Sequence, residues 1–283
     1  MDLDIAHLKT WIGKTRESRD VISPRLANSL AAILDEAPAL TEGDLPPVGI
    51  HWCLSPDIAR MSRLGPDGHP ARGDFLPPIP LPRRMWAGGE LVFSGEFLVG
   101  DEVIRRSRIT DIALKTGRSG TLCFVTVTHD YLGPRGLVLN ERHDIVYRPL
   151  DTSAERQAPE IPLPEPMQTH VADASPVLLA RYSAVTFNGH RIHYDRDYCQ
   201  REEGYPGLLV HGPLQATFLL RLASRMNGGR PPNQFTFRGV SPLFDGHSFS
   251  INAGVADNKR QFWICSSNGS LTMHATVNSR RDL

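Results

Sequence analysis

The sequence lacks an excess of either charge, a paired cysteine motif and a long apolar run. Its 283 residues include 31 basic and 31 acidic side chains. No basic run stands out, so nothing here is typical of a protein that binds nucleic acid or an anionic membrane. No apolar run approaches the roughly 20 residues that a membrane-spanning helix requires. These absences exclude a transmembrane protein built of helices and favour a soluble protein.

The cysteines and the first residues indicate where the protein works. The four cysteines (Cys53, Cys123, Cys199 and Cys265) are scattered without a CxxC pair, which is typical of reduced side chains. The start, Met1-Asp-Leu-Asp4, is acidic, whereas a signal or transit peptide is basic. We therefore expect a cytoplasmic protein, long enough for two domains or one doubled domain.

The first half of the chain predicts helices followed by a sheet. Apolar residues at roughly helical spacing indicate a short helix over 3–13, and Ser23-Pro24 begins a second helix with a capping serine and an N-terminal proline. Residues 48–54 are interpreted as a strand. The segment 55–82 holds seven prolines and is predicted to be a long loop. Loops of that length inside a domain are usually functional or mobile.

The sheet of the first half is predicted from four extended segments joined by glycine-containing turns. They are 88–99, 102–115, 121–132 and 137–148. After a proline-rich stretch, the same order of elements returns. Ser175-Pro176 begins a helix, and Gly212 to Met226 has the strongest helical pattern of the chain. Strands are then predicted over 234–241, 247–256, 261–267 and 270–278, the last two joined by an Asn-Gly turn.

This repetition predicts an α+β fold in which one helix-plus-sheet unit occurs twice. The first unit is assigned to residues 1–150 and the second to 169–283. Residues 151–168, which are rich in proline and without apolar periodicity, are interpreted as an extended linker. Only the second unit carries a dense cluster of polar side chains.

That cluster is the stretch from Thr186 to Asp195. It places an amide, two imidazoles, a guanidinium and a carboxylate within ten residues, directly after an apolar run. Polar loops that follow a core element often carry the chemistry of a protein. A second stretch, Gly204 to Pro213, leads into the long helix. We interpret the two stretches as the two halves of one active site.

The two stretches resemble the motifs of the MaoC-like hot-dog proteins, which are (R)-specific enoyl-thioester hydratases and dehydratases. The family pattern is Asp-x-Asn-Pro-(Leu or Ile)-His, followed by His-Gly at the start of the central helix. Here the first element is Asn188-Gly-His-Arg-Ile-His193 and the second is His211-Gly212. The segment from Phe75 to Gly89 is similar to the degenerate N-terminal unit of double-hot-dog members. Those members include itaconyl-CoA and mesaconyl-C4-CoA hydratases and mitochondrial-type 3-hydroxyacyl-thioester dehydratases.

The resemblance implies a double hot dog, with two antiparallel sheets each wrapped round a central helix. It also implies roles for individual residues. The family aspartate, asparagine and proline fall on Asn188, His190 and Arg191, and a neutral amide cannot be a general base. We therefore expect His193 to carry the acid–base work and Asn188 to hold the water. The N–H of Gly212, at the helix start, is expected to stabilise the enolate oxygen.

Further residues are candidates for binding the substrate. Arg191, and Arg83-Arg84 beside Trp86, could pair with a distal carboxylate, which would favour a dicarboxylyl-CoA over a fatty acyl chain. His190 and His211 are also assigned to the substrate pocket. Each of these residues has a structural alternative, because loop histidines and surface arginines usually do no chemistry. A metal site made of His190, His193 and Asp195 is also conceivable, but no further ligands support it, so we expect no metal.

The leading hypothesis is an acyl-CoA hydratase that converts itaconyl-CoA or mesaconyl-C4-CoA to citramalyl-CoA. It needs no cofactor, since CoA enters as part of the substrate. One alternative is an (R)-3-hydroxyacyl-thioester dehydratase of fatty-acid metabolism. Another is a non-catalytic acyl-CoA-binding protein, because the family aspartate is absent. The partner is therefore an acyl-CoA, with no nucleic acid and no membrane, and two such chains could form a homodimer.

Overall fold

The computed structural model describes residues 3–37, 39–117, 120–149 and 161–277. Most of the predicted linker, 151–168, lies outside the described residues, so the division into domains stays a prediction. Within the described residues no helix is long and apolar enough to cross a membrane.

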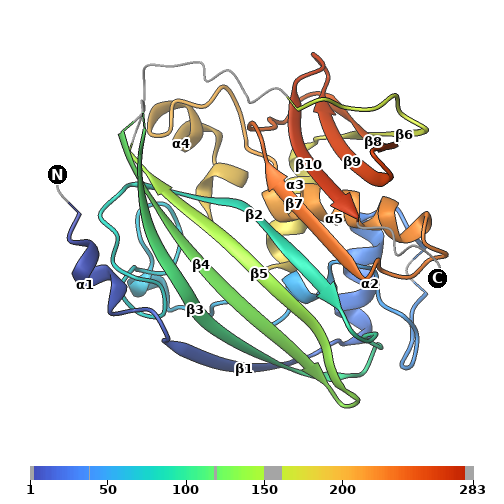
Figure 1. The fold of residues 1–283 in the computed structure, drawn as a ribbon, viewed down its shortest axis with the longest axis horizontal. Helices are drawn as coiled ribbons and strands as arrows, with labels where there is room; N and C mark the ends of the chain where they lie inside the picture. The colour runs from blue at the N-terminus through green and yellow to red at the C-terminus, as the bar shows by residue number, and fades with distance from the viewer. Residues whose placement is uncertain (1–2, 38, 118–119, 150–160, 278–283) are drawn as a thin grey trace.

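One antiparallel sheet of ten strands forms the front layer of the molecule (Figure 1). Its order is β1-β3-β4-β5-β2-β7-β10-β9-β8-β6. The first half contributes β1 (Thr15–Val21), β2 (Arg83–Phe93), β3 (Glu102–Gly117), β4 (Gly120–Gly133) and β5 (Gly136–Arg148). The second half contributes β6 (Gln168–Asp173), β7 (Gln234–Gly239), β8 (Ser248–Ala256), β9 (Lys259–Ser266) and β10 (Leu271–Val277).

The two halves of the sheet have the same topology. In each half the first strand in sequence lies at the outer edge and the second lies at the centre. The third strand returns to pair with the edge strand, and the fifth pairs with the central one. The halves join where β2 pairs with β7, from Gly88 opposite Arg238 to Val92 opposite Gln234. The repetition expected from the sequence is therefore present in the strand order.

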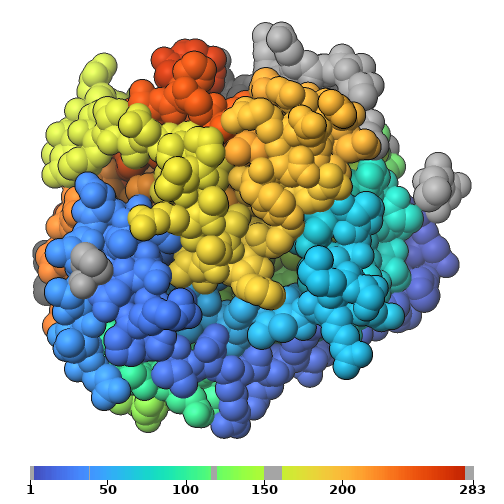
Figure 2. Space-filling model, turned by 180° about the vertical axis from the view of Figure 1, so that it is seen from behind, coloured from blue at the N-terminus to red at the C-terminus, as the bar shows by residue number. Residues whose placement is uncertain are grey.

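The helices lie behind the sheet, on the face that Figure 2 shows. They are α1 (Ile5–Lys9), α2 (Pro24–Ile33), α3 (Pro176–Val185), α4 (Arg196–Arg201) and α5 (Gly212–Arg225), with short 3-10 turns at η1 (Ile50–Cys53), η2 (Met61–Arg63) and η3 (Arg191–His193). As predicted, α2 and α3 each begin at a proline after a capping serine, Ser23 or Ser175. Helix α5 packs against β7, β8, β9 and β10.

Helix α5 is the core of the second half. Ten of its residues are buried, among them Leu214, Phe218, Leu219 and Leu222. This matches the apolar stripe seen in the sequence, and burial of such side chains stabilises a fold by roughly 1.5–3 kcal/mol each. The sheet therefore fixes the start of α5, at Gly212, in a defined place.

The first half has no equivalent of α5 among the described residues. Instead, the loop 55–82 covers the inner face of its strands, with Phe75, Leu76, Ile79 and Leu81 packed against apolar residues of β3, β4 and β5. The interpretation of residues 48–54 as a strand is wrong. Gly49 has a φ of +87°, and the next four residues form η1. The wrapped-helix arrangement therefore holds for the second half, while a proline-rich loop takes the helix's place in the first.

Strands β1 and β6 were not predicted. Both are edge strands, and both are rich in polar or charged residues that face solvent, so their alternation of apolar residues is weak. Charged edge strands protect a sheet from pairing with other chains. Strand β2 also begins at Arg83, five residues before the predicted segment, and ends at Phe93.

Candidate active site

The site is built around His193, which ends η3 and is only 6% exposed. Its Nδ1 lies 2.7 Å from the carbonyl oxygen of Leu209. Because a carbonyl only accepts, Nδ1 must carry the hydrogen, which leaves a lone pair on Nε2. Burial is the main cause that lowers the pKa of His193, to about 4. The imidazole is therefore neutral at pH 7 and able to accept a proton at Nε2.

Four imidazoles follow one another through the site. The ring centroids of His69 and His190 are 4.0 Å apart, and those of His190 and His193 are 5.5 Å apart. The rings of His193 and His211 stack at 3.6 Å with an interplanar angle of 18°. Burial is the largest cause that lowers the pKa of each of the four. The row brings together the predicted residues His190, His193 and His211, and adds His69, which was not predicted.

The start of α5 lies beside this row. His211 is the residue that precedes the helix, and its Nε2 is 2.8 Å from Oγ of Ser183. Gly212 is the first helical residue, and an N–H at that position has no acceptor within the helix. It can therefore donate to a developing negative charge beside the imidazoles.

The missing side chain of Gly212 leaves room for a neighbouring indole. A Cβ at this position would lie 3.0 Å from Cε3 of Trp86. The indole of Trp86 also packs 4.8 Å from the ring of Phe237, and its Nε1 is enclosed without a partner. The structure therefore gives Trp86 a packing role over the helix start, and the glycine makes room for this indole.

One of the two polar atoms of the Asn188 side-chain amide forms a hydrogen bond. Its Oδ1 accepts a hydrogen bond of 2.9 Å from the backbone N–H of His190. This turn holds His190 and η3 in place, and the described residues offer Nδ2 no hydrogen-bond partner. The role of Asn188 in holding water stays a prediction, and it would rest on Nδ2 as a donor.

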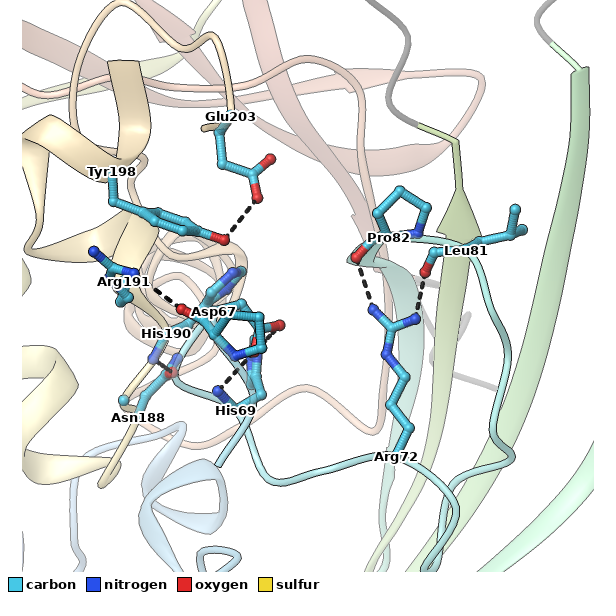
Figure 3. A network of polar contacts seen from close by, with 12 residues as sticks. Asp67, His69, Arg72, Leu81, Pro82, Asn188, His190, Arg191, Tyr198 and Glu203 are labelled. Carbon is cyan, nitrogen blue, oxygen red and sulfur yellow. Dashed lines mark hydrogen bonds and ion pairs between the residues drawn. The ribbon is translucent and has the colours of Figure 1, made fainter. Parts of the chain in front are cut away.

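The proline-rich loop of the first half docks directly onto this motif (Figure 3). The backbone N–H of Arg191 donates to the carbonyl oxygen of Asp67 at 2.9 Å, and its Nη1 donates to that of Pro66 at 3.0 Å. A Cβ on Gly68 would lie 2.0 Å from the oxygen of Gly189, so only two glycines allow the backbones to meet. The docking brings Asp67 and His69 into the site.

Two of the candidate arginines are already occupied. Arg191 contacts Asp195 through Nε at 3.0 Å and Nη2 at 2.8 Å, and its guanidinium lies 4.1 Å from the ring of Tyr198. Arg83 is 9% exposed and forms a 2.9 Å ion pair with Glu203, which joins the two halves. We therefore interpret Arg191 as docking the loop and Arg83 as joining the halves, while their assignment to the substrate stays a prediction.

Arg84 remains as the candidate for a substrate carboxylate. It lines a cavity of about 570 Å³ together with four other arginines, from the loop and from β1 and β3 (Arg16, Arg19, Arg72 and Arg105). Those four pair with carboxylates or backbone carbonyls. Within the described residues, Arg84 has no such partner. Its charge lowers the pKa of both His69 and His143, which places it near the row of imidazoles.

The side chains of Asp67, His69 and His190 offer three ligand atoms within 4.8 Å of one another, and this is the one such group found within the described residues. Oδ2 of Asp67 is 3.1 Å from Nδ1 of His69, so we interpret the two as a hydrogen-bonded pair and not as metal ligands. Asp195, which the sequence offered as a ligand with His190 and His193, instead caps α4 and pairs with Arg191.

Comparisons with known proteins agree with this geometry. Residues 49–245 match the family described as hydroxyacyl-thioester dehydratase type 2. The chain is 42% identical over 277 residues to the mesaconyl-C(4)-CoA hydratase of Chloroflexus aurantiacus, covering 94% of this chain and 96% of that one.

Solved structures share the fold. A MaoC-like dehydratase has a TM-score of 0.71 at 14% identity and covers 96% of this chain and 100% of its own. A Mycobacterium tuberculosis protein described as a double hotdog fold has a TM-score of 0.58 at 14% identity and covers 94% and 95%. The predicted fold class is confirmed. The chain belongs to the hydroxyacyl-thioester dehydratase type 2 family of MaoC-like hot-dog proteins, and it is a hydro-lyase of the acyl-thioester hydratase and dehydratase type.

Proposed function

We propose that the protein hydrates mesaconyl-C4-CoA to citramalyl-CoA. The observation that carries the proposal is the neutral, buried His193, whose free Nε2 lies in the row of imidazoles beside the start of α5. The chain's 42% identity to a mesaconyl-C(4)-CoA hydratase over nearly its whole length supports this substrate.

The chemistry fits the groups that the site brings together. Hydration adds the oxygen of water to the β-carbon and a proton to the α-carbon of the enoyl thioester. In between, negative charge develops on the thioester oxygen. The N–H of Gly212 would donate to that oxygen, and losing one such donor typically costs ~10²–10³ in rate. His193 would accept the proton from water at Nε2. CoA enters as part of the substrate, and no step in this scheme requires a cofactor.

The substrate's second carboxylate suits Arg84. In mesaconyl-C4-CoA the free carboxylate is attached to the β-carbon, so its partner must lie close to the catalytic groups. Arg84 lines the cavity and acts electrostatically on His69, which is part of the row. A guanidinium that, within the described residues, pairs with no carboxylate can bind a substrate carboxylate through two parallel hydrogen bonds.

The test is a panel of CoA esters followed by the loss of the enoyl-thioester absorbance, with the product identified by mass. We expect kcat/KM to be highest for mesaconyl-C4-CoA, lower for itaconyl-CoA and far lower for crotonyl-CoA, which lacks the carboxylate. A preference for crotonyl-CoA would overturn the substrate assignment. Saturable binding of every ester without turnover would instead support the non-catalytic binding protein.

Replacing Arg84 by glutamine should raise KM for mesaconyl-C4-CoA by roughly 10- to 100-fold. The reason is that a hydrogen bond to a charged group contributes about 1.5–3 kcal/mol. KM for crotonyl-CoA should change little. Arg181→Gln, at an exposed position on α3, is the matched control. Equal increases in KM for both substrates would show that Arg84 does not recognise the carboxylate.

The second candidate is dehydration of (R)-3-hydroxyacyl thioesters, which the family description favours. Because the same groups catalyse hydration and its reversal, the two functions differ in the acyl chain of the substrate. The cavity lined by Arg84 carries five arginines and three aspartates, which suits a short charged acyl group better than a fatty chain. Efficient dehydration of long (R)-3-hydroxyacyl-CoA esters would favour this candidate.

A further inference from the structure

We propose that His69, held by Asp67, is a second acid–base catalyst that works beside His193. The inference rests on the proposed function and names a residue that the motif does not contain. Both residues come from the loop of the first half, more than 100 positions before the motif in the sequence. They reach the site because this loop docks onto the backbone of residues 188–191.

Hydration requires two proton transfers, one from water and one to the α-carbon. The motif supplies two imidazoles, and His193 is the one whose tautomer is fixed by a hydrogen bond, from Nδ1 to the carbonyl oxygen of Leu209. Asn188 cannot make the second transfer, because an amide does not titrate and its Oδ1 is held by the N–H of His190. A second imidazole beside His193 would let two separate groups make the two proton transfers.

His69 has the geometry of such a second group. Its Nδ1 is 3.1 Å from Oδ2 of Asp67, and its backbone N–H donates to Oδ1 of the same carboxylate at 3.0 Å. These two contacts fix the ring and leave Nε2 without a partner in the described part of the chain. Nε2 is not fully enclosed by protein, and the His69 side chain is 19% exposed.

His69 also differs from the other three imidazoles in what it contacts. His193 donates to a carbonyl and His211 contacts a serine hydroxyl, whereas His69 contacts a carboxylate. Within the described residues, it is the one member of the row that does so. A neighbouring carboxylate stabilises the imidazolium form, as in other carboxylate–histidine pairs. Of the four, His69 is therefore the one suited to hold the proton that is delivered to carbon.

The reaction then balances. Nε2 of His193 takes a proton from water as the oxygen bonds to the β-carbon. The π-electron pair moves toward the thioester and forms an enolate, held at Gly212. The enolate collapses as Nε2–H of protonated His69 gives its proton to the α-carbon. The proton on His193 returns to His69 through His190, whose ring lies between them, or through solvent.

The charged groups around His69 determine the expected pH dependence. Burial is the largest cause that lowers its pKa, and Arg84 on β2 and Arg72 on the loop lower it further. Asp67 raises this pKa, while His190 faces the ring from the motif. Because His69 must be protonated to act as an acid, kcat/KM should fall as the pH rises through its pKa. Removing the charge of Asp67 should move this fall to lower pH.

The first test is His69→Gln assayed with mesaconyl-C4-CoA. We expect kcat to fall by ~10²–10⁴-fold, the usual contribution of a general acid or base, with KM within a few-fold. His170→Gln, at an exposed position on β6, is the matched control and should behave as the wild type. A melting temperature close to that of the wild type shows that the variant is folded.

The second test separates catalysis from positioning. Asp67→Asn should lower kcat and shift the alkaline fall of kcat/KM to lower pH, and Asp67→Glu should restore part of both. In deuterium oxide, His193→Gln should still exchange the α-hydrogens of a saturated CoA ester, whereas His69→Gln should not, because the exchange needs only the group that faces the α-carbon.

The outcomes distinguish this proposal from the proposed function. An active wild type with a fully active, folded His69→Gln variant would overturn the role of His69 and leave the hydratase assignment intact. An unchanged pH profile in Asp67→Asn would also overturn it. A wild type that hydrates none of the enoyl-CoA esters would overturn both.

Discussion

Replacing His193 by glutamine is expected to lower kcat for hydration by ~10²–10⁴-fold, because it removes the base that takes the proton from water. Glutamine can still donate to the carbonyl of Leu209 from its amide, so the local backbone should be kept. KM should stay within a few-fold, since the thioester and the carboxylate contact other residues. The measurement is steady-state kinetics with mesaconyl-C4-CoA, and a loss confined to KM would contradict the role as a base.

The same residue predicts the acid side of the pH profile. Burial lowers the pKa of His193 to about 4, so the imidazole stays neutral down to that pH. Protonation at lower pH blocks Nε2, and kcat/KM should fall as the pH drops through about 4. His247→Gln, an exposed position before β8, is the control and should keep the wild-type profile. An acid fall centred near pH ~6.5, the ordinary value for histidine, would show that His193 is not buried in solution.

The second large effect is expected at Gly68, far from the motif in sequence. Its φ of +86° and the 2.0 Å that would separate a Cβ from the oxygen of Gly189 make alanine incompatible with the docked loop. In Gly68→Ala the loop must move away from the motif and carry Asp67 and His69 with it. We expect kcat to fall by ~10²-fold or more, within the range for losing an acid–base group.

A matched control separates docking from backbone strain. Gly43 has a nearly identical φ of +90°, and a Cβ there would meet nothing within 4 Å. Gly43→Ala should therefore carry only the cost of a left-handed conformation, roughly 1–2 kcal/mol of stability, with normal kcat. If both variants lose the same activity, strain explains the loss. If neither does, the loop is not needed for catalysis.

The grouping of the motif's residues could be predicted because its parts are close together in the sequence. Residues 188–193 and His211-Gly212 lie on either side of a short helix, and the structure brings His193 and His211 into ring contact. Helix α5 was predicted for a similar reason. Its apolar stripe is local, and its burial against four strands is what such a stripe indicates.

The contribution of the first half could not be predicted in the same way. Asp67 and His69 reach the site largely through the backbone of Pro66, Asp67 and Gly68, which contacts Arg191 and Gly189 of the motif. Contacts through backbone atoms depend little on residue type, so they leave no recognisable pattern in the sequence. The signal available in the sequence was the length of the loop and its prolines, which indicated function without naming residues.

The arginines show why spacing alone does not assign a ligand. Arg83, Arg84 and Arg191 were all candidates in the sequence, and the ion pairs of the folded chain distinguish them. Glu203 neutralises Arg83 from 120 positions away, and Asp195 neutralises Arg191 from within its own turn. Arg84 has no such carboxylate among the described residues, and only the folded chain reveals that difference.

The two halves of the sheet share a topology and contribute to one core cluster, but different elements cover them. Helix α5 fills the second half, whereas the loop 55–82 covers the first and leaves a cavity lined by charged side chains. In this account the second half supplies the base and the oxyanion donor, and the first half supplies the carboxylate pocket and the acid. Catalysis then depends on contacts between the halves, such as the pair of Arg83 and Glu203.

A crystal structure with a saturated CoA ester, which binds but cannot be hydrated, is the most direct measurement. We predict that the thioester oxygen lies within hydrogen-bond distance of the N–H of Gly212, about 2.9 Å, and that the acyl carbons lie between His193 and His69. An acyl group bound away from the start of α5, or kept from it by Trp86, would contradict the hydratase mechanism proposed here.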